Sequence, residues 1–321
     1  MTVLRFALRR LVYGAAITLG VSVLTFAMLE LAPGEFFDDL KLDAAVGSGA
    51  IETLRQEHGL TAPAPVRYVR WLGAVVRGDF GLSLAHHAPV APLLWERTRN
   101  TLILTVPALI AAWLIALPLG LWTARRHGGI VDRLCTAGTS TLLAVPDLLI
   151  ALALLLFALE SGLFPAGGMF SPGSADAGGA PLGDLARHAV LPLCAIVLST
   201  LPAILRHVRA SALEAARTPA VMAARGHGIV GWRLDVRYIL TIASSPLISL
   251  AGLSIAGLLS ASLLIEVVMS WPGLGPLLVD ALLARDTHVV LAASMLATVF
   301  LVGGNLLADV ALVAIDPRIR A

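Results

Sequence analysis

Residues 101–123 read TLILTVPALIAAWLIALPLGLWT, an apolar run of 23 positions without a charged side chain. An α-helix rises about 1.5 Å per residue, so a run of this length crosses a hydrocarbon core about 30 Å thick. Five other apolar stretches have a similar character. The six predicted spans are residues 11–32, 101–123, 134–159, 189–205, 239–265 and 289–315. The sequence therefore predicts an all-α membrane protein with six transmembrane helices.

The composition agrees with a membrane location. Of the 321 residues, 58% are hydrophobic and 14% are charged, whereas an average soluble domain is about 25% charged. A net charge of +2 argues against binding to nucleic acid, which needs a strong basic excess on one face. The single lysine, Lys41, stands between two leucines, so the chain lacks the Gly-Lys-Ser/Thr of an ATP-binding P-loop. Cys135 and Cys194 fit no metal or disulfide spacing, and we expect neither a metal nor a cofactor.

Arginines are distributed unevenly between the predicted spans. They cluster before span 1, in the 2–3 and 4–5 loops and in the tail, whereas the 3–4 and 5–6 loops contain only Arg187 and Arg285. Cytoplasmic loops are enriched in basic residues, so both termini and the 4–5 loop are predicted to be cytoplasmic. The 1–2 loop contains seven basic residues. We nevertheless predict that it is external, because loops longer than about 60 residues cross the membrane largely regardless of charge.

This orientation divides the chain into three predicted parts. Residues 1–33 form an N-terminal anchor helix, residues 34–100 an external loop subdomain, and residues 101–321 a five-helix core with a cytoplasmic loop at 206–238. In the external part, apolar residues at 66, 69 and 76 share one helical face after a Pro-Ala-Pro break. This pattern predicts an amphipathic helix on the outer membrane surface or over the mouth of the bundle. An ordinary packed helix in a small external cap is the alternative.

The 4–5 loop contains a short helix signal. Thr218 followed by Pro219 is typical of a helix start, and Gly226 and Gly228 are suited to its end. The predicted helix from Pro219 to Arg225 is small and apolar for an exposed element. Such a surface indicates a docking site.

The same loop resembles a known motif. Met222-Ala223-Ala224, followed by Gly228, is similar to the Glu-Ala-Ala-x-x-x-Gly motif of ABC-transporter permeases, with methionine in place of glutamate. Other segments resemble the dipeptide/oligopeptide/nickel branch of these binding-protein-dependent permeases. They are PVRYVRWL (65–72), RGDFG (77–81), NTL (100–102), PLG (118–120), RASALE (209–214), EVVMSWPGLG (266–275) and DPRIR (316–320).

The resemblance implies a six-helix ABC importer permease with a cytoplasmic coupling helix and a large external loop between helices 1 and 2. Such a subunit is not catalytic, since partner subunits hydrolyse ATP. The implied partners are a second homologous permease, two cytoplasmic ATPases, an external substrate-binding protein and the lipid of a bacterial or archaeal inner membrane. The implied cargo is peptides, or nickel or related small solutes. The predicted ATPase-coupling residues are Pro219, Ala220, Met222, Ala223, Ala224 and Gly228.

Residues 266–275 suggest a bend at the external mouth of the permease. Glycine and proline end span 5 here, and a tryptophan is expected at the level of the membrane interface. We interpret this segment as an external gate. A plain loop with an anchoring tryptophan is the alternative. The candidate gate residues are Glu266, Trp271, Pro272 and Gly273.

Asp147 directly follows Pro146 near the middle of predicted span 3. A carboxylate at the bilayer centre costs about 2.5–3.5 kcal/mol, so it should face the bundle interior or a water-filled path. The missing N–H of Pro146 is expected to open the helix at this point. We interpret both residues as lining the translocation path, where Asp147 would attract a cationic group. The alternative is that Asp147 pairs with a polar group on another helix.

Other functional classes receive less support from the sequence. An ion-driven secondary carrier often shows repeats and broken helices paired across its halves, and none is evident. An intramembrane hydrolase would need a motif such as His-Glu-x-x-His, which does not occur, and the Gly-Ser-Gly at 47–49 lacks a serine-protease context. A receptor or scaffold subunit that transports nothing is a third alternative. The adjacent His86 and His87 are a candidate metal site or a solvated pair.

Overall fold

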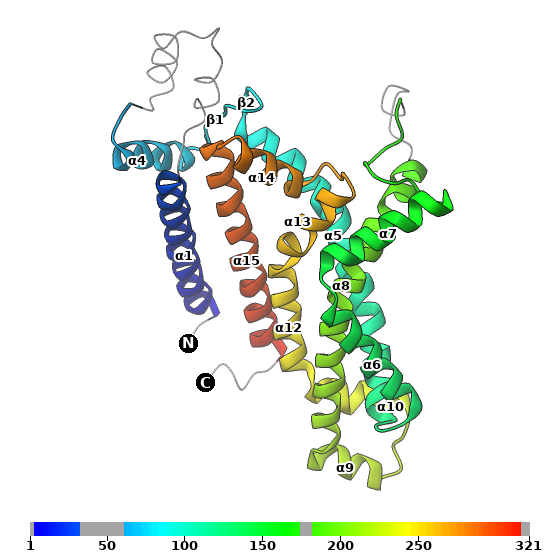
Figure 1. The fold of residues 1–321 in the computed structure, drawn as a ribbon. Coiled ribbons are helices and arrows are strands. Elements are labelled where there is room, and N and C mark those ends of the chain that lie inside the picture. Colours follow the sequence, from blue (N-terminus) through cyan, green and yellow to red (C-terminus); the bar gives the residue numbers. More distant parts are fainter. Residues whose placement is uncertain (1–2, 33–60, 174–181, 316–321) are drawn as a thin grey trace.

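The structure is a computed structural model, and it describes residues 3–32, 61–173 and 182–315 (Figure 1). Over these ranges the chain is predominantly helical, as predicted. The strands in them are short: β1 (Leu82–Ser83) pairs antiparallel with β2 (Ala88–Pro89). The DPRIR segment and the first 27 residues of the predicted external subdomain lie outside the described residues.

Four helices in the described ranges are long and apolar enough to cross a membrane. Two bent pairs of shorter helices meet the same criteria when each pair is taken together, so these ranges hold four to six spans. The four long helices are α1 (Val3–Leu31), α5 (Val90–Arg125), α8 (Leu182–Ala216) and α15 (Thr287–Ile315).

The predicted third span is bent sharply at Pro146, where the sequence predicted an opening of the helix. Residues 134–159 are divided between α6 (Ile130–Ala144) and α7 (Asp147–Ser161), whose axes differ by 98°. Val145 is extended, with φ −90° and ψ 122°, because the ring of Pro146 disfavours a helical residue before it. The apolar run is therefore long enough for one span but is bent sharply at the proline.

The predicted fifth span is also broken. The chain forms α10 (Trp232–Leu234), a π-helix η2 (Asp235–Ile239) and α11 (Leu240–Ile242), and then bends by 71° into α12 (Ser244–Ala256). After α12, the chain continues through α13 (Leu258–Val268) and α14 (Leu274–Leu283).

Two helices extend well beyond the spans predicted for them. α5 begins at Val90 rather than Thr101, and α8 covers 35 residues around the predicted 17-residue span at 189–205. Arg206 and the other polar residues after Leu205 end the apolar run but continue the helix. Hydropathy therefore delimits the part of α8 suited to lipid, whereas the helix itself projects further.

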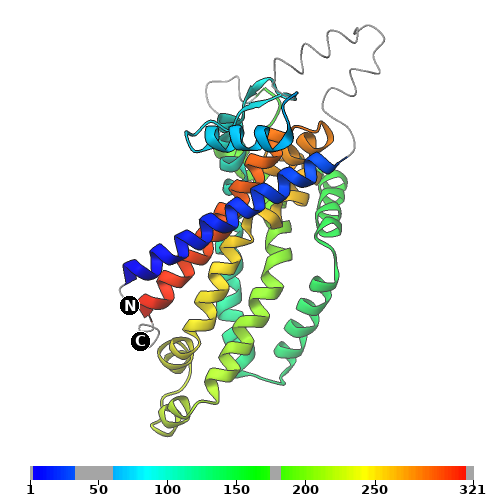
Figure 2. The same ribbon diagram turned by 90° about the vertical axis from the view of Figure 1, so that its left-hand side faces the viewer.

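The long helices form a layered bundle (Figure 1). α5 packs along α8, and α15 lies between α1 and α12. Figure 2 shows α1 and α15 side by side and oblique to α5 and α8. Close helix contacts depend on glycine, because a Cβ on Gly120 would collide with Val208, and one on Gly252 would collide with Ala308. Both glycines therefore allow the backbones of neighbouring spans to approach closely.

The predicted amphipathic helix of the external part is present as α4 (Ala64–Val75). It lies across one end of α1, where the Tyr68 hydroxyl is 2.7 Å from the Ser22 hydroxyl (Figure 1). Trp71 is buried and its indole N–H donates to the carbonyl of Phe80, while Val69 on the opposite face is exposed. This arrangement agrees with an amphipathic helix at the end of the bundle.

Candidate functional site

The short helix predicted in the 4–5 loop is α9 (Pro219–Gly226). Thr218 is extended, with φ −71° and ψ 148°, and Pro219 occupies the first helical position, as the sequence predicted. The Thr218 hydroxyl donates to the carbonyl of Ala215, at the end of α8, instead of capping α9. Gly228 follows the helix with φ +79°, a conformation that glycine adopts without strain.

α9 has one buried face and one exposed face. Val221 and Ala224, three positions apart, are 0% and 4% exposed and pack into a hydrophobic cluster with Leu234. Met222 on the other face is 56% exposed, and Ala223 is exposed beside it. Ala224 was predicted to belong to the docking surface, but its side chain points into the protein. The exposed residues of α9 are Pro219, Ala220, Met222, Ala223, Arg225 and Gly226.

The segment that follows α9 joins it to the rest of the bundle. Ile229 N–H donates to the Ala224 carbonyl, and η2 packs against α9. Asp235 in η2 is buried and lies 2.9 Å from the guanidinium of Arg125 at the end of α5. A force on α9 would therefore reach α5 and α8 through packed side chains and an ion pair.

A second ion pair joins α6 to α8 at the same end of the molecule. Arg209 donates from Nε to Asp132 Oδ1 at 2.5 Å and from a terminal nitrogen to Oδ2 at 2.9 Å. Gly128 N–H also donates to Asp132 Oδ2, and His127 lies 3.2 Å from it. Bidentate arginine–carboxylate pairs have a defined geometry as well as a charge attraction. This pair therefore holds the first turn of α6 in place on α8.

The segment between α13 and α14 is a largely buried, hydrogen-bonded loop in which Ser270 is exposed. Trp271 is 0% exposed, and its indole N–H donates to the carbonyl of Asn100 at 2.9 Å. The Asn100 amide donates in turn to the Pro272 carbonyl. The indole ring is therefore packed inside the protein rather than exposed on its surface, and the level of Trp271 relative to the membrane stays a prediction. The large side chain instead anchors the loop against the N-terminal half of α5.

Glu266, near the end of α13, accepts a hydrogen bond from a residue that follows the same loop. Its carboxylate is fully buried, and Oε2 accepts the Gly275 N–H at 2.8 Å, while Thr101 Oγ1 accepts the Leu274 N–H. A Cβ on Gly273 would collide with Glu266 and with Thr101. The loop is thus tightly packed, and glycine is required at that position.

Asp147 is the first residue of α7, immediately after the break at Pro146, and its side chain is exposed. A carboxylate in the first turn of a helix is favoured by the helix dipole. No residue in the described part of the chain forms an ion pair with it. The alternative role, as a partner for a polar group on another helix, therefore finds no such group in these ranges.

The described residues bring no three His, Cys, Asp or Glu side chains together as metal ligands.

Comparison with known protein families shows which family this helical architecture belongs to. The family model described as "Binding-protein-dependent transport system inner membrane component" matches residues 116–321. The chain belongs to this permease family. A companion model for the N-terminal part of such membrane components matches residues 3–105, so the match extends over nearly the whole permease.

Individual relatives can be aligned with the permease over almost the full length of both chains. The oligopeptide transport system permease protein AppB of Bacillus subtilis is 31% identical over 317 residues, which cover 98% of this chain and 99% of that protein. The dipeptide transport system permease protein DppB of Escherichia coli K12 is 31% identical over 337 aligned residues, covering 99% of both. Among solved structures, the inward-facing MetNI methionine ABC transporter matches with a TM-score of 0.54 and 18% identity, covering 70% of this chain and 96% of that chain.

These findings confirm the resemblance drawn from the motifs. The chain is a multi-pass membrane permease subunit of an ABC transporter, and it is not an enzyme. The likeness to the MetNI structure shows the fold of an ABC importer permease over most of the chain. None of these matches supports the ion-driven carrier that the sequence left as an alternative.

Proposed function

We propose that this permease forms half of the translocation path of an ATP-driven importer of peptides. The observation that carries the proposal is the end-to-end match to relatives named as oligopeptide and dipeptide permeases. Nickel and other small solutes are the competing cargoes within the same branch. A cell that lacks this subunit should lose uptake of a labelled dipeptide or oligopeptide and regain it when the gene is restored. Unchanged peptide uptake together with lost nickel uptake would contradict the peptide assignment.

We infer that the subunit works with a second homologous permease, two ATPases and an external substrate-binding protein, since importers of this family are assembled in that way. The outward face of α9 is suited to an ATPase because its exposed side chains, apart from Arg225 in the last turn, are short or apolar and the helix is backed by a packed cluster. Rocking of α9 would move α5 and α8 as rigid bodies between two arrangements. Gly228 would contribute by letting the chain turn sharply at the end of the docking helix.

The proposed topology has six spans, counting each bent pair as one, with both termini in the cytoplasm. In support, the start of α1, the end of α15 and α9 all lie away from the end of the molecule that carries α4 (Figure 1). The proposed parts are the anchor helix 1–33, the external subdomain 34–100 and the core 101–321. Cysteines at Val76 and Arg217, in a cysteine-free background, should react with an impermeant reagent from opposite sides. Reaction of both from outside would contradict this topology.

Asp147→Asn is expected to reduce uptake of cationic cargo selectively, by roughly fivefold, because one opposite charge near the path contributes about 1 kcal/mol. The break at Pro146 supports this role, since it leaves the carboxylate exposed and without an ion-pair partner in the described ranges. The change preserves side-chain shape, so expression and ATPase binding should be unaffected. Competition between cationic and neutral peptides measures the effect. Equal uptake of both by the variant would show that Asp147 does not serve the cargo.

Cross-linking the loop at 269–275 to the second permease is expected to block transport if this loop is the external gate. Ser270 is suitable for a cysteine because it is exposed, whereas its neighbours Met269 and Trp271 are buried. Glu266, Pro272 and Gly273 would fix the conformation of the gate through their hydrogen bonds and close packing. The ATPases should still assemble on the cross-linked complex, and reduction of the cross-link should restore uptake. Full transport after complete cross-linking would exclude the gate.

A further inference from the structure

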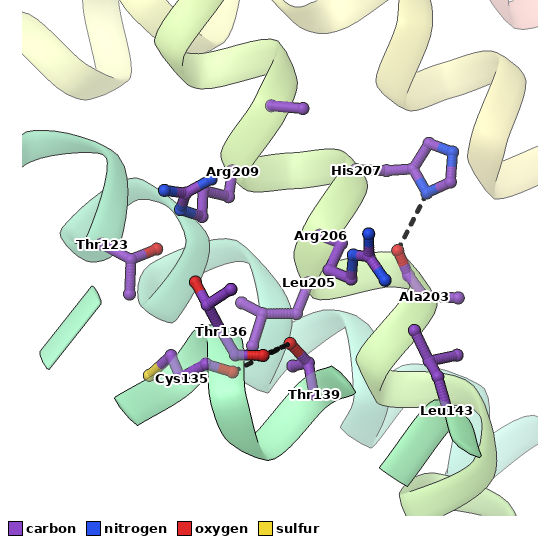
Figure 3. Close-up of a pocket in the computed structure, with 11 residues that line it drawn as sticks. Thr123, Cys135, Thr136, Thr139, Leu143, Ala203, Leu205, Arg206, His207 and Arg209 are labelled. Atoms are coloured by element: carbon purple, nitrogen blue, oxygen red, sulfur yellow. Dashed lines mark hydrogen bonds between the residues drawn. The ribbon is translucent and has the colours of Figure 1, made fainter. Parts of the chain in front are cut away.

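A groove of about 430 Å³ runs between α6 and α8 beside the Asp132–Arg209 pair. Cys135, Thr136, Thr139 and Leu143 line it from one face of α6. Ala203, Arg206, His207 and Ala210 line it from one face of α8. In Figure 3 the guanidinium of Arg206 lies between the α6 side chains and His207. Arg209, which also lines the groove, forms the ion pair with Asp132.

The charge in the groove is positive and is concentrated on Arg206. Arg209 is neutralised by its bidentate contact with Asp132. Arg206 has no carboxylate partner within the described ranges, and none of the residues that line the groove is acidic. The Nδ1–H of His207 donates to the Ala203 carbonyl, so this ring is not counted among the donors to an anion. An anion in the groove would therefore meet the guanidinium of Arg206 without a competing carboxylate.

The groove changes from polar to apolar along its length. Thr136 makes no side-chain hydrogen bond to the described residues, whereas Thr139 donates its hydroxyl to the Cys135 carbonyl. Leu143, two turns further along α6, is 44% exposed. On α8, Arg206 directly follows the apolar run that ends at Leu205. This order, from cation and hydroxyl to an exposed leucine, matches a headgroup followed by an acyl chain.

We propose that the groove binds the phosphate of an acidic phospholipid in the leaflet at the α9 end of the molecule. The guanidinium of Arg206 would hold the phosphate, Thr136 would donate a hydrogen bond to it, and the acyl chain would lie along Leu143. Basic pockets between membrane helices favour anionic headgroups for the same electrostatic reason. A lipid in this position would also cover the exposed face of α6 next to the Asp132–Arg209 pair.

The purified full-length chain in a non-ionic detergent provides the test. Dihexanoyl phosphatidylglycerol, dihexanoyl phosphatidylcholine and inorganic phosphate are titrated separately, and the shift of the thermal unfolding midpoint gives the affinity of each. Arg206→Gln should weaken phosphatidylglycerol binding about fivefold. One basic residue at an anionic surface contributes about 1 kcal/mol of binding free energy, which corresponds to that change in affinity. Arg133→Gln is the matched control, because Arg133 is exposed on α6 at the same end but does not line the groove.

The expected result is stabilisation by phosphatidylglycerol alone, with an affinity about fivefold weaker in Arg206→Gln and changed less than twofold in Arg133→Gln. An equal response to phosphatidylcholine, or equal weakening by both substitutions, would overturn the site. An equal response to inorganic phosphate would overturn its assignment to a lipid. Loss of binding once the second permease is co-purified would overturn it as well, because the neighbouring subunit would then cover the groove.

Discussion

Ala223→Asp is expected to abolish ATP-driven transport while the chain stays folded in the membrane. Ala223 lies on the outward face of α9, so its aspartate would be solvated in the free subunit and tolerated there. Docking of an ATPase would bury that charge without a partner, which costs about 3 kcal/mol and weakens the complex by more than about a hundredfold. Co-purification of the ATPase and ATP-driven uptake are the two measurements.

Ala224→Asp is the informative comparison, because the two alanines are adjacent but face opposite ways. Ala224 is buried against the cluster behind α9, so a carboxylate there should lower the thermal stability of the free subunit. Ala223→Asp should leave that stability unchanged. Normal uptake and ATPase recovery in Ala223→Asp would show that α9 is not the docking helix.

Removal of one partner from the Asp132–Arg209 pair is expected to destabilise the subunit by about 3 kcal/mol, because a largely desolvated charge is left unpaired. The Asp132 side chain is 5% exposed and that of Arg209 is 24% exposed. Asp132→Ala and Arg209→Ala should each lower the unfolding midpoint. The double variant should be far less destabilised than the sum of the two, since contacting residues are strongly coupled.

The exposed pair of Arg10 and Asp309 provides the control for this cycle. Its side chains are 48% and 19% exposed, and exposed ion pairs contribute about 0–1 kcal/mol. The coupling energy of Arg10 and Asp309 should therefore be well below that of Asp132 and Arg209. Additive effects of Asp132→Ala and Arg209→Ala would contradict a clamp between α6 and α8.

Local signals in the sequence predicted local structure well. Thr218-Pro219 predicted the start of α9, and the proline break before residue 64 predicted the helix of the external part. Both depend on backbone preferences that act within a few residues. The same kind of signal at Pro146 indicated an opening of the helix, but not the 98° bend, which depends on packing against other elements.

The features that the sequence did not reveal all depend on distant contacts. The sequence did not indicate that Asp132 forms an ion pair between helices. An acidic residue in a first helical turn is common, and its partner Arg209 lies 77 positions away. The partner of Trp271 is Asn100, 171 positions away, so composition alone favoured a membrane-interface role. Ala223 and Ala224 point in opposite directions because one face of α9 packs against Leu234. That contact forms only where α10, which follows α9 in the chain, folds back against it.

Purification of the tagged chain from its own membranes, followed by reconstitution into vesicles, tests most directly whether it is the permease of an ATP-driven importer. We expect a second permease and an ATPase to co-purify with it. With the binding protein added outside, peptide uptake should then require ATP inside the vesicles and be insensitive to collapse of ion gradients. Uptake driven by an ion gradient, with no ATPase recovered and no need for ATP, would contradict this function.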